Sequence, residues 1–204
     1  MPKDTFFRLS EEKKQRIQDA AFEEFCRVPY SQASINKIIK AAEIPRGSFY
    51  QYFVDKEDLF VYLISLKSEE VSEALCKILR AEQGDLFRFL DKIIEKFEKF
   101  YQSQKFGEVM MFFSDQRAFH LQEFPKDDCL MTDIKTRFDQ NLIHLIDFDL
   151  LKVEEEEKTI LMNIISAIFH NSAVGLMHMK QPKPDRVIKE LKKQLGSLER
   201  HYRK

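Results

Sequence analysis

The chain has 204 residues, with 33 basic and 34 acidic side chains and 44% hydrophobic residues. This composition can supply a sizeable core, and it excludes a disordered, collagen-like or low-complexity chain. The chain contains 19 Phe but only 8 Val and 4 Thr. Because sheets favour β-branched residues, we expect an all-α protein. The near-neutral charge does not by itself point to nucleic acid, because a dedicated nucleic-acid binder is often strongly basic.

Four helices are predicted in the first 80 residues. Ser10 is a favourable N-cap for the first of them. A short helix follows over 35–42, with apolar residues at the spacing i, i+3, i+4 and i+7. After a three-residue turn, a brief helix that begins near a proline runs to about Tyr52. Asp55 is the expected N-cap of a fourth, long helix that runs to about Leu79.

The rest of the chain is also predicted to be helical. Gly84 and Asp85 interrupt the apolar pattern, and KQPKP at 180–184 reads as a loop. Between and beyond these breaks, apolar periodicity predicts five helices, and about nine in all. They cover residues 86–100, 109–117, 134–145, 154–179 and 188–202.

The termini and cysteines indicate where the chain functions. The first ten residues lack the apolar core of a signal peptide, and no stretch reaches the roughly 18 apolar residues of a membrane helix. Cys26, Cys76 and Cys129 are odd in number and widely separated, so neither a disulfide framework nor a cysteine zinc site is expected. We therefore expect a cytoplasmic protein that does not bind a membrane.

No motif for catalysis, nucleotide binding or metal binding is present. The sequence lacks the G-x-S-x-G, P-loop and G-x-G-x-x-G patterns. His170 and His178 are eight positions apart on one predicted helix, about 12 Å by helical rise, so they cannot hold a metal by themselves. We expect no enzyme activity, no cofactor and no metal.

Residues 34–59 carry the most specific motif. The segment reads SINKIIKAAEIPRGSFYQYFVDKEDL, and two short helices joined by a tight turn fit a helix-turn-helix. It resembles the signature of TetR/AcrR-type bacterial transcriptional regulators, and the resemblance extends over about residues 10–70. It implies an N-terminal three-helix DNA-binding domain over 1–55, with the motif at about 33–53. A long fourth helix would join it to a helical ligand-binding and dimerisation domain over 56–204.

Several side chains of this segment suit contacts with DNA. Arg46 and Lys56 are cations suited to phosphate contacts or, for Arg46, to a guanine edge, and Gln51 can pair with adenine. Ser34 at a helix N-terminus can meet a phosphate, and Gly47 lets the backbone approach a base. Phe49 and Phe53, four positions apart, should instead belong to the core. By resemblance, the DNA contacts map to Ser34, Arg46, Gly47, Ser48, Tyr50, Gln51, Tyr52 and Lys56.

The turn of the motif departs from the family pattern. The family usually has Gly or Asn there, whereas this chain has Glu43. The position often needs a positive φ, which glutamate adopts at some cost. The sequence therefore predicts a strained but otherwise ordinary turn.

The second region is rich in aromatic residues and methionines, for which two interpretations stand. They can simply form core, or they can line an apolar cavity between helices that takes a hydrophobic ligand. The family resemblance implies such a cavity, without indicating its residues. Our candidates are Phe97, Phe100, Tyr101, Met110, Phe113, Phe138, Asn141, Phe169 and His170.

The last two helices offer candidates for a dimer interface. Ala167, Asn171 and Gly175 form a line of small residues at i, i+4 and i+8, and a heptad-like seam follows at Ile188, Leu191, Leu195 and Leu198. Ordinary packing within the chain is one interpretation. The other is an interface with a second copy, since a helix-turn-helix dimer must place two recognition helices about 34–36 Å apart.

Together these features predict a homodimeric, sequence-specific transcriptional regulator. It would be a repressor that a small hydrophobic ligand releases from a palindromic double-stranded DNA operator. Two alternatives remain open: a helical small-molecule-binding protein or enzyme that has lost DNA affinity, and a structural adaptor without a ligand cavity. The charge distribution fits the first prediction, since residues 1–53 carry 9 basic against 7 acidic residues and 54–182 carry 16 against 24. An acidic body should weaken non-specific attachment to DNA, while the basic stretch 183–204 has no assigned role.

Overall fold

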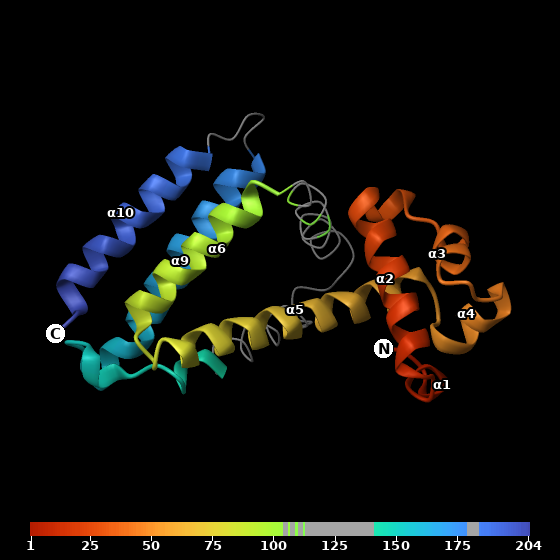
Figure 1. Cartoon of the computed structure of the whole chain (residues 1–204), viewed down its shortest axis with the longest axis horizontal. Coiled ribbons are helices and arrows are strands. Elements are labelled where there is room, and N and C mark those ends of the chain that lie inside the picture. Colours follow the sequence, from red (N-terminus) through yellow and green to blue (C-terminus); the bar gives the residue numbers. More distant parts are fainter. Residues whose placement is uncertain (104–105, 107–108, 110–111, 113–140, 179–183) are drawn as a thin grey trace. The chain divides into compact units, whose positions relative to one another are not determined.

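The computed structural model of the chain describes residues 1–103, 106, 109, 112, 141–178 and 184–204 (Figure 1). Within this part the regular elements are helical, apart from one antiparallel bridge between Leu151 and Arg203. The all-α prediction is confirmed. The predicted helices at 109–117 and 134–145 fall largely outside the described residues, as do Cys129, Met110, Phe113 and Phe138.

The described residues divide into two compact units. Met1–Val71, Val109 and Phe112 belong to unit 1, whereas Ser72–Ser103, Phe106 and the residues from Asn141 onward belong to unit 2. The division falls within α5 (Lys56–Ala81). The functional boundary at residue 55 remains a prediction.

Unit 1 contains α1 (Asp4–Phe7), α2 (Glu11–Arg27), the short 3-10 helix η1 (Tyr30–Gln32), α3 (Ile35–Ala41), α4 (Arg46–Tyr52) and the first part of α5 (Figure 1). Ser10 caps α2, accepting the amide of Lys13 at 3.4 Å. Asp55 accepts the amide of Asp58 at 2.8 Å at the start of α5. Both predicted caps are thus confirmed, whereas α1 was not predicted.

An aromatic core holds unit 1 together. Phe25, Phe49, Phe53 and Phe60 are at most 1% exposed, and the ring centroids of Phe25 and Phe60 lie 4.9 Å apart in an edge-to-face arrangement. Burial of each such ring contributes about 1.5–3 kcal/mol. The predicted core positions of Phe49 and Phe53 are therefore confirmed, and they fix α4 on the other helices.

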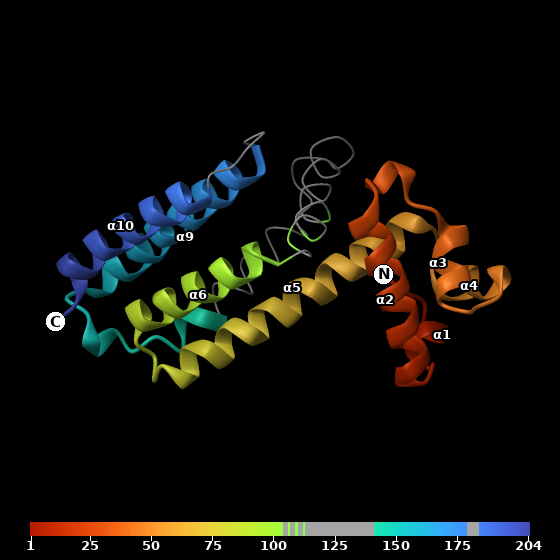
Figure 2. The same cartoon turned by 45° about the horizontal axis from the view of Figure 1, so that its top comes forward.

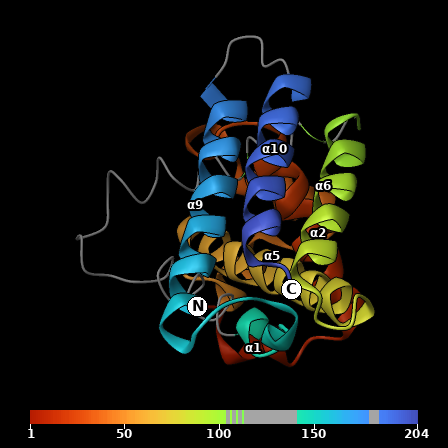
Figure 3. The same cartoon turned by 90° about the vertical axis from the view of Figure 1, so that its left-hand side faces the viewer.

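Unit 2 contains the last part of α5, α6 (Leu86–Tyr101), the 3-10 helix η2 (Phe148–Leu150), α9 (Glu155–His178) and α10 (Pro184–Tyr202). In Figures 2 and 3, α10 runs beside both α9 and α6, and it contacts each of them. Their apolar faces enclose a second core. Asp85 caps α6, accepting the amides of Phe87 and Arg88 at 3.1 and 3.0 Å.

Arg203 connects the end of α10 to the start of α6. Its guanidinium nitrogens each lie 2.9 Å from a carboxylate oxygen of Asp85, a bidentate pair. Burial alone would raise the pKa of Asp85, but the hydrogen bonds and charge of Arg203, with the amide of Arg88, hold it below its ordinary value. One of the cations of the basic stretch 183–204 therefore has a structural role within unit 2.

Candidate nucleic-acid interface

Helix α4 has one buried and one exposed face. Phe49 and Tyr52 are buried at 0% and 6% exposure. Arg46, Gly47 and Gln51 are exposed, and Tyr50 is 42% exposed. Their spacing of i, i+1, i+4 and i+5 places them on one side of the helix, and Ser48 is half-buried beside them. The exposed face therefore combines a cation, an amide, a phenol and bare backbone.

Gly47 has no packing reason to be glycine. A Cβ built at this position would meet nothing within 4 Å, and its φ is not in the left-handed region. Glycine inside a helix costs roughly 0.5–1 kcal/mol relative to alanine. Packing among the described residues therefore does not explain a glycine at this position.

The turn between α3 and α4 has the geometry that the sequence predicts. Glu43 has φ 54, its amide donates to Lys40 at 3.3 Å, and the amide of Ile44 donates to Ile39 at 3.0 Å. This pair of bonds is a Schellman motif, in which the left-handed position is usually glycine. The expected positive φ at glutamate is confirmed.

Ser34 and Lys56 make contacts that the sequence did not predict. Ser34 occupies the N-cap position of α3, but its hydroxyl does not cap the helix, and its amide donates to Glu24 Oε1 at 3.1 Å. The ammonium of Lys56 donates to the carbonyl oxygens of Tyr30 and Ala33 at 2.7 and 3.1 Å. Both residues therefore hold the segment that leads into α3.

Burial and these contacts shift the pKa values of Glu24 and Lys56. Burial would raise the pKa of Glu24, which is 6% exposed, but the hydrogen bonds from Arg27 and the Ser34 amide, with the charges of Arg27 and Lys37, lower it below its ordinary value. Burial lowers the pKa of Lys56. Glu24 thus stays ionised beside the α3 N-terminus, where a negative charge is favourable.

Tyr52 lies on the inner side of α4. Its ring is 6.2 Å from that of Phe6, and Lys13 Nζ lies 5.7 Å from the ring centroid. With 6% of its surface exposed, it offers little to a duplex, in contrast to Tyr50. The family resemblance maps both tyrosines to DNA contacts, but residues two apart on a helix point in different directions.

Four residues near the motif, two on α3 and two in the N-terminal segment, are not among the predicted DNA contacts. Lys37 and Lys40 are exposed on α3, three positions apart and therefore on one side of that helix. The sequence carried a signal for them, since they flank the buried Ile38 and Ile39. Lys3 and Thr5, which contact the end of α4, gave no comparable signal.

This N-terminal region matches a known family. Residues 17–63 match the family described as bacterial regulatory proteins, tetR family. The HTH-type transcriptional regulator AcrR of Shigella flexneri is 32% identical over 85 residues, which are 42% of this chain and 40% of AcrR. The transcriptional regulator AcuR of Cereibacter sphaeroides is 40% identical over 50 residues, 24% of this chain and 23% of AcuR. The chain thus spans less than half the length of these relatives.

In this N-terminal region the chain is similar to the TetR/AcrR family. Solved structures extend the likeness of fold to nearly the whole chain. A TetR-family transcriptional regulator from Chloroflexus aurantiacus has a TM-score of 0.53 and 24% identity, covering 100% of this chain and 99% of that one. Escherichia coli NemR in its reduced form has a TM-score of 0.65 and 14% identity, covering 95% and 97%. The family's arrangement of an N-terminal helix-turn-helix and a C-terminal helical domain is thereby confirmed.

In the C-terminal part of the chain, three of the proposed ligand residues meet at one ring. The ring centroids of Phe97, Phe100 and Tyr101 lie 6.0, 5.4 and 4.6 Å from that of Phe106. Phe106 was not predicted. Phe169 packs against the core of unit 2, Asn141 is exposed, and the side chain of His170 lies outside the described residues, as do the other candidates.

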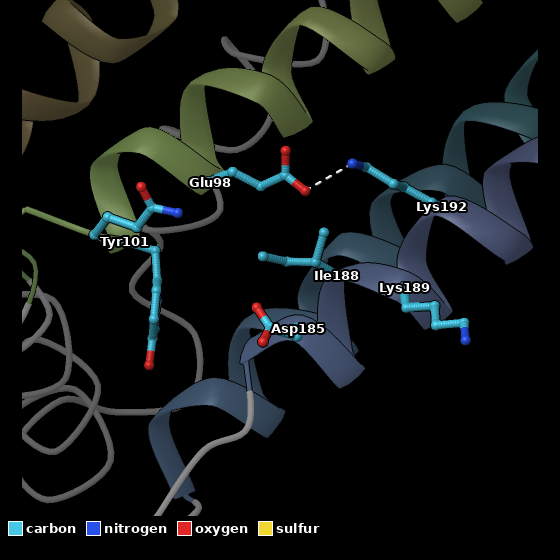
Figure 4. Close-up of a pocket in the computed structure, with 7 residues that line it drawn as sticks. Glu98, Tyr101, Asp185, Ile188, Lys189 and Lys192 are labelled. Atoms are coloured by element: carbon cyan, nitrogen blue, oxygen red, sulfur yellow. Dashed lines mark hydrogen bonds and ion pairs between the residues drawn. The ribbon is translucent and has the colours of Figure 1, made fainter.

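A cleft of about 510 Å³ lies between α6 and α10 (Figure 4). Of the proposed ligand residues, Tyr101 lines it, and the other lining residues are Glu98, Gln102, Asp185, Ile188, Lys189 and Lys192. Lys192 Nζ pairs with Glu98 Oε1 across it at 2.6 Å. This lining is mostly charged, so the cleft is not the apolar cavity that the sequence predicts.

The proposed dimer residues separate into two groups. Ile188, Leu191 and Leu195 are 7%, 4% and 4% exposed inside unit 2, and Leu198 packs against the same core. Of the two interpretations of the 3-4 spacing, packing within the chain accounts for the three buried residues. Ala167 and Asn171 are exposed, and Gly175 lies further along α9.

Three further observations concern metal binding, membrane spans and cysteines in the described residues. In the part that the structure describes, no three His, Cys, Asp or Glu side chains are grouped so as to hold a metal ion. None of the described helices is both long and apolar enough to cross a membrane. Cys26 and Cys76 are buried, and neither forms a disulfide within the described residues.

Proposed function

We propose that the chain is a cytoplasmic, sequence-specific DNA-binding transcriptional regulator without enzyme activity. The observation that carries the proposal is the exposed face of α4. Arg46, Tyr50 and Gln51 are exposed on this face, and at Gly47 the backbone itself is exposed. The fully buried rings of Phe49, within α4, and Phe53, directly after it, anchor the helix in the core of unit 1. This arrangement suits a recognition helix in a major groove, where arginine reads guanine and glutamine reads adenine.

The proposed contacts divide into two kinds. Arg46, Gly47, Ser48, Tyr50 and Gln51 are assigned to base edges and adjacent phosphates. Ser34, Tyr52 and Lys56 keep supporting roles, because the structure engages them within the chain. Lys37 and Lys40 add exposed cations for the phosphate backbone.

We further propose a homodimer that uses the outer face of α9. Ile160 and Ile164 are 55% and 37% exposed, and with Ala167 and Asn171 they follow the spacing i, i+4, i+7 and i+11 along one side of the helix. Exposed isoleucines on a stripe of small residues favour close approach of a second helix. Two copies would present two copies of α4 to a palindromic operator.

The proposed regulation is release from the operator by a small hydrophobic ligand. Support comes from the aromatic group around Phe106 and from a related structure described as the multidrug binding protein EbrR complexed with ethidium, with a TM-score of 0.59 and 15% identity over 92% of this chain and 99% of that one. A ligand that binds one conformation of the dimer more tightly than the other would change operator affinity by that difference.

The test is selection of duplexes from a random pool by the purified chain, followed by anisotropy titration of the selected sequence at several salt concentrations. Gln51→Ala should lower affinity for the selected site by about 1–3 kcal/mol, without affecting affinity for random DNA. Gln15→Ala, an exposed glutamine on α2, is the matched control. No salt-sensitive binding to any duplex would reject the proposal in favour of a small-molecule-binding protein that has lost DNA affinity.

A further inference from the structure

The first seven residues pack directly against the end of α4. Phe6 of α1 is fully buried, and its ring centroid lies 4.9 Å from that of Phe53, 5.3 Å from that of Tyr62 and 6.2 Å from that of Tyr52. Pro2 is buried as well. The N-terminal segment Met1–Phe7 is therefore anchored in the core of unit 1.

From this anchor, the segment donates hydrogen bonds to three consecutive carbonyl groups of α4. The amide of Lys3 donates to the Tyr52 carbonyl at 2.8 Å, and its ammonium to the Tyr50 carbonyl at 2.8 Å. The hydroxyl of Thr5 donates to the carbonyl between them, that of Gln51. These are carbonyls of the last turn, which have no acceptor role within the helix itself.

Helix α4 needs such support because it is intrinsically weak. It has seven residues, and isolated helices shorter than about 12 residues are marginal in water. Gly47 weakens it further, and its N-cap is Pro45, which makes no side-chain cap bond. The ammonium of Lys3 at its C-terminus also complements the helix dipole.

We infer that Lys3 and Thr5 are positioning residues for DNA recognition. They fix the backbone of Tyr50 and Gln51, whose side chains are exposed on the proposed reading face, and thereby set how this last turn meets the bases. This inference rests on the proposed function. It assigns to the N-terminal segment a role in specificity without any contact between that segment and DNA.

The sharpest test exploits Thr5, which is exposed and uncharged. Thr5→Val removes the hydroxyl and keeps the shape, whereas Thr5→Ser keeps the hydroxyl. In the free protein, amide hydrogen exchange at residues 50–53 should accelerate about three- to tenfold in Thr5→Val, the effect of one net hydrogen bond, and return to the wild-type rate in Thr5→Ser. Exchange in α2 and α3 should not change.

DNA binding provides the second measurement. Thr5→Val should lower affinity for the selected operator about three- to tenfold and leave affinity for random duplexes unchanged, so the specificity ratio falls. Lys3→Ala should also lower operator affinity and leave affinity for random duplexes unchanged. The dependence of its operator affinity on salt concentration should equal that of the wild type. Arg8→Ala, which removes an exposed cation of the same region, controls for a general charge effect.

Three results would overturn the inference. Wild-type exchange at residues 50–53 in Thr5→Val would show that the hydroxyl does not hold the last turn. A uniform loss of affinity for all duplexes, with a shallower salt slope in Lys3→Ala only, would show that Lys3 contacts a phosphate directly. Unchanged operator affinity in both variants would remove the role in specificity. Exchange is measured without DNA, so a failure of the proposed function leaves this first result interpretable.

Discussion

The ammonium of Lys56 lies 2.7 Å from the carbonyl oxygen of Tyr30 and 4.4 Å from the centroid of its ring. A second bond, to the Ala33 carbonyl at 3.1 Å, ties the same cation to the residue before Ser34. The start of α5 therefore holds the entry to α3 through a lysine that sequence patterns assign to a phosphate. Any effect of this lysine on DNA binding combines charge with the geometry of the segment that it holds.

Lys56→Ala should lower the free energy of unfolding by about 1–2 kcal/mol, because two carbonyl groups lose a charged donor. Lys56→Gln retains a donor without the charge and should recover part of that stability. Both are measured by urea denaturation. Lys77→Ala, at a side chain that is 74% exposed, is the control and should unfold like the wild type. If Lys56→Ala lost operator affinity at full stability, the lysine would be a phosphate contact after all.

The lowered pKa of Glu24 predicts that the stability of unit 1 falls at acid pH. Its folded-state pKa lies below its ordinary value, so ionised Glu24 contributes stability that is fully present above the unfolded pKa of about 4.3 and is lost as the pH falls through the folded pKa. Thermal unfolding between pH 7 and pH 3 should show this loss in the wild type. Glu24→Gln should be less stable at pH 7 and should depend less on pH below 4.3.

The neighbouring residue provides the matched control for this titration. Glu23 is exposed, so Glu23→Gln should follow the wild-type curve. A Glu24→Gln curve parallel to that of the wild type throughout the acid range would mean that other carboxylates carry the pH dependence. Asp85 is the first of these to examine, because its pKa is lowered by Arg203 in unit 2.

The local rules of sequence predicted much of this molecule. Caps at Ser10 and Asp55, the short helices of the motif and a positive φ at Glu43 depend on neighbours in the chain, which periodicity and turn chemistry can reveal. The contacts of Lys56 with Tyr30 and of Glu24 with Ser34 join residues 10 to 26 positions apart. No pattern of spacing distinguishes such a cation from one that faces solvent.

Helix α1 and the role of the seam from Ile188 to Leu195 also depend on contacts between residues far apart in the chain, which spacing does not reveal. Helix α1 has four residues, too few for a periodic signal, and it forms because Phe6 is buried among rings from other helices. The 3-4 spacing from Ile188 to Leu195 predicts a packing face, but a seam within one chain and a seam between chains have the same spacing. Only burial within unit 2 distinguishes them.

Glu43→Gly should raise the free energy of unfolding by about 0.5–1 kcal/mol, because glycine adopts the left-handed conformation without the Cβ penalty. Glu43→Ala retains a Cβ and removes the carboxylate that lies 3.8 Å from Arg16, so it separates strain from ion pairing. Chemical denaturation of the full chain measures both. Equal effects of the two substitutions would show that φ is not the source of the strain.

Gly84 should tolerate no side chain. Its φ is +80, and a Cβ would lie 2.8 Å from both the Asp147 nitrogen and the Leu145 oxygen, which are backbone atoms. Gly84→Ala should therefore cost about 2–4 kcal/mol. Gly196→Ala is the control, because its nearest neighbour is the flexible end of Arg200 at 3.7 Å, and alanine should stabilise α10 by about 0.5–1 kcal/mol. Equal melting temperatures of the two variants would contradict this.

Gly47→Ala separates folding from recognition most directly. The open space around Gly47 means that alanine should stabilise α4 by about 0.5–1 kcal/mol, whereas a backbone that contacts a base would be displaced by the added methyl group. The variant should melt at a higher temperature than the wild type and yet bind the selected operator at least tenfold more weakly. Calorimetry and anisotropy titration on the same sample measure the two effects. A more stable variant with unchanged operator affinity would show that DNA does not approach α4 at Gly47, and the proposed contacts on α4 would then be Arg46, Ser48, Tyr50 and Gln51.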